Sequence, residues 1–156
     1  MQPDRPSFNW IWLPLPVGFV TPSLIIFVMD VALGKRPVAA SIRELARRQF
    51  AEGENLFSLA LLGLIPFALL ALILFLFWRG ADRRRVPALS IAGTTGALAF
   101  MIPSHVGVWL PLYTNEHMSS TAVIAFLFIP FVCCVTMCVG LLVGLLASRR
   151  SAAQPV

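Results

Sequence analysis

The sequence contains four long stretches without a charged residue, and these constrain the fold more than any other feature. They cover residues 8–29, 56–78, 86–113 and 121–148. A helix needs roughly 20 apolar residues to cross the hydrocarbon core of a bilayer. In that core the backbone groups must bond to one another, which only helices or a closed barrel allow. The stretches lack the alternating pattern of barrel strands, so they predict helices.

The composition supports a membrane location. Hydrophobic residues make up 58% of the 156 residues, and charged residues make up only 12%. A soluble domain has about 25% charged residues. A soluble fold of this composition would have too few charged side chains to cover its apolar surface. We therefore predict an all-α fold, a polytopic membrane helical bundle of about four transmembrane helices plus one short amphipathic interfacial helix. Residues 1–156 are expected to form a single integral membrane domain.

Prolines modify the predicted spans. Pro14, Pro16 and Pro22 interrupt the first stretch, and Thr21-Pro22 resembles a helix start. The first stretch is therefore predicted to be either a kinked span or a re-entrant half-helix. Pro103 is expected to end or bend the third span. The four spans are predicted at approximately 11–33, 56–78, 87–109 and 120–147.

Residues 38–52 have the pattern of a short amphipathic helix. Val38, Ile42 and Leu45 recur at helical spacing, while the arginines of the segment lie on other faces. A basic helix with an apolar stripe lies in the plane of the lipid head groups. We therefore expect this helix to follow the first span along the membrane surface.

The basic residues lie next to the predicted spans. The formal net charge is +5, and the positive-inside rule with anionic lipid accounts for it better than nucleic acid, so no nucleic-acid partner is expected. The triple arginine between the second and third spans is the strongest topogenic signal. It predicts that both termini are cytoplasmic, in a bacterial inner membrane. The arginines expected to contact lipid head groups are Arg43, Arg47, Arg48, Arg83, Arg84 and Arg85.

Small residues mark the predicted contact between the third and fourth spans. Lipid gives little hydrophobic drive for helix association, so close approach at small side chains must supply it. The second span is bulkier and is expected to face lipid over much of its surface. Self-association through the fourth span is the alternative to a contact within the chain. The predicted helix-packing residues are Ala92 and Gly96 with Thr136, Gly140, Gly144 and Ser148, which include one GxxxG pair.

Two groups of polar or reactive side chains in the spans are candidates for chemical sites. Cys133, Cys134 and Cys138 lie in the middle of the fourth span. They could bind a soft metal, but buried thiols without a second cysteine cluster are expected to act as small hydrophobic groups. Asp30 ends the first span and is followed by basic Lys35 and Arg36. We expect Asp30 to be paired or hydrated at the interface, with a buried functional role as the alternative.

The segment 104–120 collects the polar and titratable groups. It is expected to be a loop, and His105, Glu116 and His117 are weak candidates for binding a divalent metal or transferring protons. Their spacing matches no established metal motif, so a solvated interface loop is the favoured interpretation. No cofactor is expected.

The function predicted from these features is non-catalytic. No phosphate-binding glycine loop, nucleophile elbow or zinc motif is present in the sequence. The favoured hypothesis is an accessory, assembly or anchoring subunit of a membrane complex, with the lipid bilayer and other membrane subunits or further copies of itself as partners. The first alternative is a small oligomeric channel or transporter. The second is a membrane-bound enzyme or redox subunit that uses the 104–120 loop.

Overall fold

The protein is described by a computed structural model that covers residues 8–50, 55–80, 83–114 and 122–152. Helices are the only regular elements of these described residues. In chain order they are α1 (Asn9–Trp12), α2 (Pro14–Ala32), α3 (Val38–Arg48), α4 (Leu56–Arg79), a 3-10 turn (Arg83–Arg85), α5 (Val86–Trp109), α6 (Pro111–Thr114) and α7 (Ala122–Ala152).

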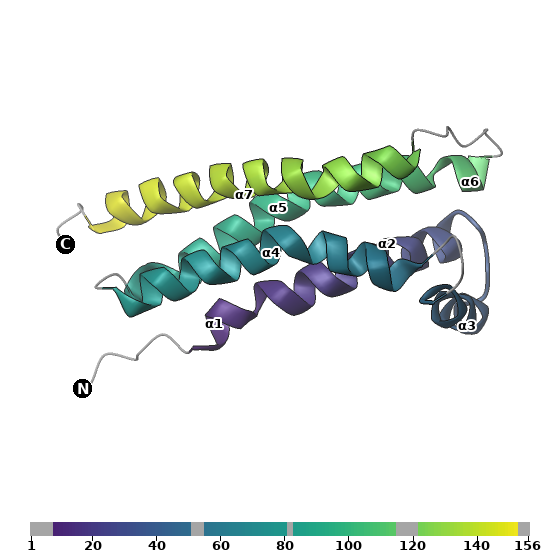
Figure 1. The fold of residues 1–156 in the computed structure, drawn as a ribbon, viewed down its shortest axis with the longest axis horizontal. Helices are drawn as coiled ribbons and strands as arrows, with labels where there is room; N and C mark the ends of the chain where they lie inside the picture. Colours follow the sequence, from purple (N-terminus) through teal and green to yellow (C-terminus); the bar gives the residue numbers. More distant parts are fainter. Residues whose placement is uncertain (1–7, 51–54, 81–82, 115–121, 153–156) are drawn as a thin grey trace.

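Among the described residues, four helical segments are long and apolar enough to cross a membrane, which confirms the predicted all-α bundle. They are Asn9–Ala32, Leu56–Arg79, Arg83–Thr114 and Ile124–Arg149. Figure 1 shows these segments running roughly along one axis, with α1, the turn between α4 and α5, and the end of α7 at one end of the bundle. The helices α3 and α6 lie at the opposite end. The protein is therefore a membrane protein whose successive spans run in opposite directions.

The first span is a kinked span, as one of the two alternatives predicted. The predicted helix start at Thr21-Pro22 is wrong. Pro22 lies inside α2, and the helical break is instead at Leu13, between α1 and α2. A proline removes only its own backbone donor. The neighbouring Thr21 hydroxyl donates to the Val17 carbonyl oxygen at 2.6 Å, so this side chain also has a partner within the helix. Helix α2 continues through Pro22.

The third span also continues through a proline, so Pro103 does not end it, and the predicted loop of residues 104–120 is wrong over residues 104–114. Helix α5 extends to Trp109 with Pro103 inside it, and the short helix α6 follows directly. Pro103 is exposed on α5. Ending the helix there would leave several backbone groups without partners in lipid, whereas continuing it leaves only one.

Helix α4 has a buried inner face and an outer face with exposed apolar side chains such as Leu72, which fits the expectation that it faces lipid over much of its surface. It packs against α2, α5 and α7. Phe67, Leu70 and Leu74 on its inner face are fully buried. Helix α7 packs mainly on α5 and is the more peripheral span, with Phe131 70% exposed on its outer face. Large side chains of α4 therefore fill the centre of the bundle on one face of the helix and remain exposed on the other.

Helix α3 lies across the end of the bundle and ends at Arg48, earlier than the predicted residue 52. Residues 49 and 50 form a turn and a bend, and residues 51–54 lie outside the described part of the chain. Leu45 packs against buried residues of α2 and α4. Val38 and Ile42 are 53% and 55% exposed, so two of the predicted apolar residues face away from the bundle. This arrangement gives α3 an apolar edge at the membrane surface.

The closest helix packing joins α5 and α7 at small residues. A Cβ atom added to Gly96 would lie 2.5 Å from the Thr136 carbonyl oxygen. One added to Gly140 would overlap the Ala92 carbonyl oxygen, and one added to Gly144 would lie 2.8 Å from the Ala92 Cβ. The contacts at Gly96 and Gly140 involve backbone atoms, which cannot move aside as a flexible side chain can. The two helices can approach this closely only where side chains are absent or small.

We expect Gly140→Ala to lower the free energy of unfolding by about 1–3 kcal/mol, because the added methyl group would force the two backbones apart. The matched control is Gly107→Ala in α5, where an added Cβ would meet nothing within 4 Å. That change should be neutral or stabilising by up to about 1 kcal/mol, since alanine favours the helix. Reversible unfolding in detergent measures both. Equal effects of the two substitutions would contradict the close packing at Gly140.

Candidate functional site

The candidate site is centred on Asp30 at the end of α2, where the chain turns away from the bundle. The Asp30 side chain is 3% exposed. Lys35 has a left-handed backbone conformation with φ of 50°, and the Arg36 backbone N–H donates to the Asp30 carbonyl oxygen at 3.2 Å. This turn brings the Arg36 guanidinium back toward the Asp30 carboxyl group. Asp30 is therefore both buried and paired.

Tyr113 joins Asp30 to the far end of the third span. Its hydroxyl donates to Asp30 Oδ1 at 2.6 Å. The short helix α6 positions the ring, because the Tyr113 backbone N–H donates to the Leu110 carbonyl oxygen at 2.9 Å. The bond connects residues 83 positions apart in the sequence. It ties the ends of the first and third spans together on the side of the bundle where α3 lies.

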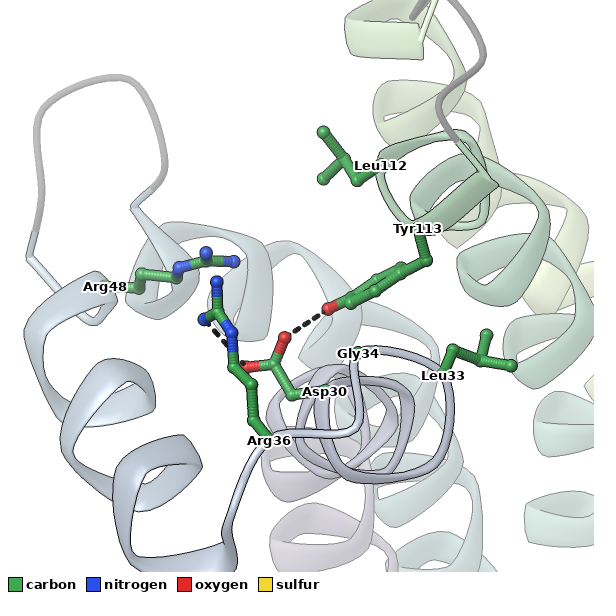
Figure 2. A pocket seen from close by; sticks show the side chains of 7 residues that line it. All are labelled: Asp30, Leu33, Gly34, Arg36, Arg48, Leu112 and Tyr113. Atoms are coloured by element: carbon green, nitrogen blue, oxygen red, sulfur yellow. Dashed lines mark hydrogen bonds and ion pairs between the residues drawn. The ribbon is translucent and has the colours of Figure 1, made fainter.

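A pocket of about 400 Å³ opens beside this pair. Figure 2 shows Arg36 and Arg48 directed toward Asp30 from one side and Tyr113 from the other. The Arg36 Nη1 atom lies 4.0 Å from Asp30 Oδ2, which makes an ion pair longer than a hydrogen bond. The pocket therefore contains two guanidinium groups, one carboxyl group and one phenol. Its lining residues are Asp30, Leu33, Gly34, Arg36, Arg48, Leu112 and Tyr113.

Glu44 holds two arginines of α3 in place. Its carboxylate accepts hydrogen bonds from Arg47 Nη2 at 2.8 Å and from Arg48 Nε at 2.9 Å. These bonds stabilise the charged form and lower the pKa of Glu44 to about 2. The two arginines differ in environment, because the Arg48 side chain is 14% exposed and the Arg47 side chain is 70% exposed. Arg48 thus belongs to the pocket, whereas Arg47 faces outward.

The other arginines expected to contact head groups are at both ends of the bundle. Arg43 is exposed on α3, where its Nε donates to the Ala39 carbonyl oxygen at 3.4 Å. At the opposite end Arg83 and Arg84 are exposed and Arg85 is half-buried. The Arg83 guanidinium lies 5.0 Å from the centroid of the Trp78 ring, a cation–π arrangement typical of an interface. Contact of these arginines with lipid stays a prediction.

His105 is not in a loop, contrary to expectation. It lies in α5, is 3% exposed, and its Nδ1 is 3.0 Å from the Met101 carbonyl oxygen. Its ring packs against Phe126 of α7. Glu116 and His117 lie outside the described residues, so their grouping with His105 stays a prediction. Within the described part of the chain, no three His, Cys, Asp or Glu residues are close enough to hold a metal ion.

The remaining predicted residues lie along α7. Cys133 is buried in the core, Cys134 is half-buried and Cys138 is exposed, so the expectation of buried thiols holds only for Cys133. The reason is helical geometry, because Cys134 and Cys138 share the face next to the buried one. Ser148 is half-buried, and its hydroxyl donates to the Leu145 carbonyl oxygen at 2.9 Å.

Sequence reasoning missed the bond between Tyr113 and Asp30. It placed Asp30 near Lys35 and Arg36 but assigned Tyr113 no partner. A usable signal existed, because antiparallel spans place the end of the first span and the end of the third on the same side of the membrane. A phenol there is within reach of a carboxyl group in the same interfacial layer.

Known proteins offer no functional lead for this chain. It matches no protein-family model, and no curated protein or solved structure is significantly similar to it. Its function is therefore inferred from the geometry around Asp30 and from the helices that position this group.

We expect Tyr113→Phe to lower the free energy of unfolding by about 1–3 kcal/mol, because it leaves a buried carboxyl oxygen without its hydrogen bond. Thr114→Val is the matched control, since the exposed Thr114 hydroxyl bonds, within the described part of the chain, only to the Leu110 carbonyl oxygen of the same turn, at 3.3 Å. Its effect should stay within about 0.5 kcal/mol. Unfolding in detergent followed by circular dichroism compares them. Indistinguishable stabilities of Tyr113→Phe and the unmodified protein would contradict a structural role for the bond.

The Glu44 bonds predict a dependence on acid pH. Because the folded pKa is lowered, to about 2 from 4.5, the stabilisation by these bonds is present above about pH 4.5 and is lost as the pH falls toward 2. The difference in thermal midpoint between the unmodified protein and Glu44→Gln should shrink over this range. Carboxyl titration by NMR provides the direct test, and a midpoint near 4.5 would contradict the hydrogen bonds from Arg47 and Arg48.

Proposed function

We propose that this membrane protein is a non-catalytic accessory, assembly or anchoring subunit of a membrane complex. The observation that carries the proposal is the use of polar side chains as links between distant segments. Tyr113 bonds to Asp30, and the Ser90 hydroxyl donates to the Trp10 carbonyl oxygen at 2.8 Å. In lipid such bonds fix the relative positions of helices. A rigid bundle suits a subunit whose role is to present a fixed surface.

The surface that this bundle presents is the basic helix α3. Gln49 Nε2 donates to Ser23 Oγ of α2 at 3.3 Å, and Leu45 packs into the core beneath. These contacts fix the orientation of α3, so Arg43 and Arg47 point outward. A fixed array of arginines at the membrane surface fits an acidic partner surface or anionic lipid.

The proposed location is a bacterial inner membrane with both termini in the cytoplasm. The start of α1 and the end of α7 lie at the same end of the bundle as the triple arginine of residues 83–85 (Figure 1). Under the positive-inside rule this compact basic turn supports a cytoplasmic position for that end. Helix α3 would then lie at the opposite membrane surface.

Purification in mild detergent followed by native mass spectrometry tests the proposed function. We expect a second kind of subunit to remain bound at a fixed stoichiometry. Arg43→Glu should weaken that association, because it reverses a charge on the outer face of α3. The control is Arg149→Glu, which makes the same charge change at the other end of the bundle. Unaided turnover of a substrate by the pure chain, or ion flux through reconstituted protein above that of empty liposomes, would contradict the proposal.

A further inference from the structure

The pocket beside Asp30 has the size and the charge of an anion-binding site. Its volume of about 400 Å³ lies within the range of small-molecule pockets. Arg36 enters from the turn after α2, and Arg48 enters from α3. Figure 2 shows both guanidinium groups directed into the space next to Asp30. Among the described lining residues, the two guanidinium groups share the pocket with the Asp30 carboxyl group, and Glu44 holds Arg48 from outside the lining.

Asp30 does not use up the hydrogen-bonding capacity of Arg36. The closest approach of their side chains is 4.0 Å, beyond the distance of a hydrogen bond. Asp30 instead receives the Tyr113 hydroxyl on its other oxygen, at 2.6 Å. The carboxyl group therefore orients the Arg36 guanidinium by charge while the planar N–H donors of that group remain directed at the pocket. Arg36 is 47% exposed, so a ligand can reach it.

Arg48 supplies a second, more rigid guanidinium. Its Nε is bonded to Glu44 at 2.9 Å, and its side chain is only 14% exposed. A guanidinium fixed in this way loses little conformational freedom when it binds a ligand. Guanidinium groups match the geometry of phosphate oxygens and bind them through paired hydrogen bonds.

The position of the pocket relative to the membrane indicates which anions it meets. The adjacent helix α3 exposes Val38 and Ile42 together with Arg43, which is the pattern of a helix in the head-group plane. Phosphate groups of lipids are concentrated in this layer. The ends of α2 and α6 that form the pocket therefore face the same layer.

We propose that the pocket between α2, α3 and α6 binds the phosphate group of an anionic molecule, with Arg36 and Arg48 as the binding residues. Asp30 and Tyr113 act as positioning residues, since they hold Arg36 and the end of the third span around the pocket. The phosphate can belong to an anionic lipid head group or to a free phosphate compound. This inference does not depend on the accessory role proposed above.

The test uses the full chain in a neutral detergent at constant ionic strength. The thermal midpoint is measured with increasing short-chain phosphatidylglycerol, short-chain phosphatidylcholine or inorganic phosphate, because a ligand that binds the folded state raises the midpoint. We expect a saturable rise with phosphatidylglycerol that phosphatidylcholine does not match. An equal rise with inorganic phosphate would support the site and identify a free anion as its ligand.

Two variants and a control locate the binding. Arg36→Gln and Arg48→Gln should each weaken the apparent affinity about tenfold or more, the loss expected for one charged hydrogen-bonding group. The control is Arg149→Gln, which removes an exposed arginine at the opposite end of the bundle and should leave the affinity unchanged. Arg43→Gln, on α3 but outside the pocket, should weaken the affinity less than Arg48→Gln does. Arg48→Gln keeps the Asp30–Arg36 pair, so it carries the test if Arg36→Gln fails to fold by circular dichroism.

Two results would overturn the proposal. One is the absence of any saturable rise with both phosphatidylglycerol and phosphate. The other is an equal loss of affinity in Arg43→Gln and Arg48→Gln, since it would show that anions gather along the whole basic face of α3 and not in the pocket.

Discussion

In a hydrocarbon solvent each backbone amide has to find its partner within its own helix, and the rest of this structure depends on that requirement. Its effect is clearest at the prolines. Pro22, Pro66, Pro103 and Pro130 each lie inside one of the four spanning helices, and each helix continues past its proline. In water such residues commonly end a helix, because the freed groups can bond to solvent. In lipid, ending the helix would leave several groups unbonded, whereas continuing it leaves one.

With the backbone satisfied, the bundle is assembled by fit and by a few polar bonds. Gly96 and Gly140 allow α5 and α7 to approach until their backbones touch. Around α4 the helices are held apart by large side chains, because Phe67 and other bulky residues fill the space between α4 and its neighbours. Hydrogen bonds between side chains then connect the ends of different spans, as between Tyr113 and Asp30. The site beside Asp30 exists because α2, α3 and α6 all terminate at the same membrane surface.

The parts of this structure that follow from local chemistry could be predicted from the sequence. The four spans follow from the length of the uncharged stretches, and α3 follows from the spacing of Val38, Ile42 and Leu45. The role of α4 at the centre could not be predicted, because it depends on which faces of four apolar helices meet. His105 lies in α5 and not in a loop, because a proline that ends helices in water does not end this helix in lipid.

The candidate site was predictable only in part. Asp30 and Arg36 are six residues apart, and their pairing followed from the sequence. Tyr113 and Arg48 come from other elements, so their arrival at Asp30 depends on the packing of the whole bundle. The Tyr113 bond spans 83 positions, a separation at which no local pattern gives information. Once the number of spans is known, their antiparallel order shows that Tyr113 and Asp30 lie on the same side of the membrane.

Labelling of single cysteines in sealed membrane vesicles tests the four-span arrangement most directly. In a variant that lacks Cys133, Cys134 and Cys138, one cysteine is introduced in turn at Asn9, Arg43, Arg84, Thr114 or Arg149 and exposed to a maleimide that does not cross membranes. The account predicts that positions 9, 84 and 149 react from one side and positions 43 and 114 only from the other. Reaction of positions 43 and 84 from the same side would show that α4 does not cross the bilayer and would contradict it.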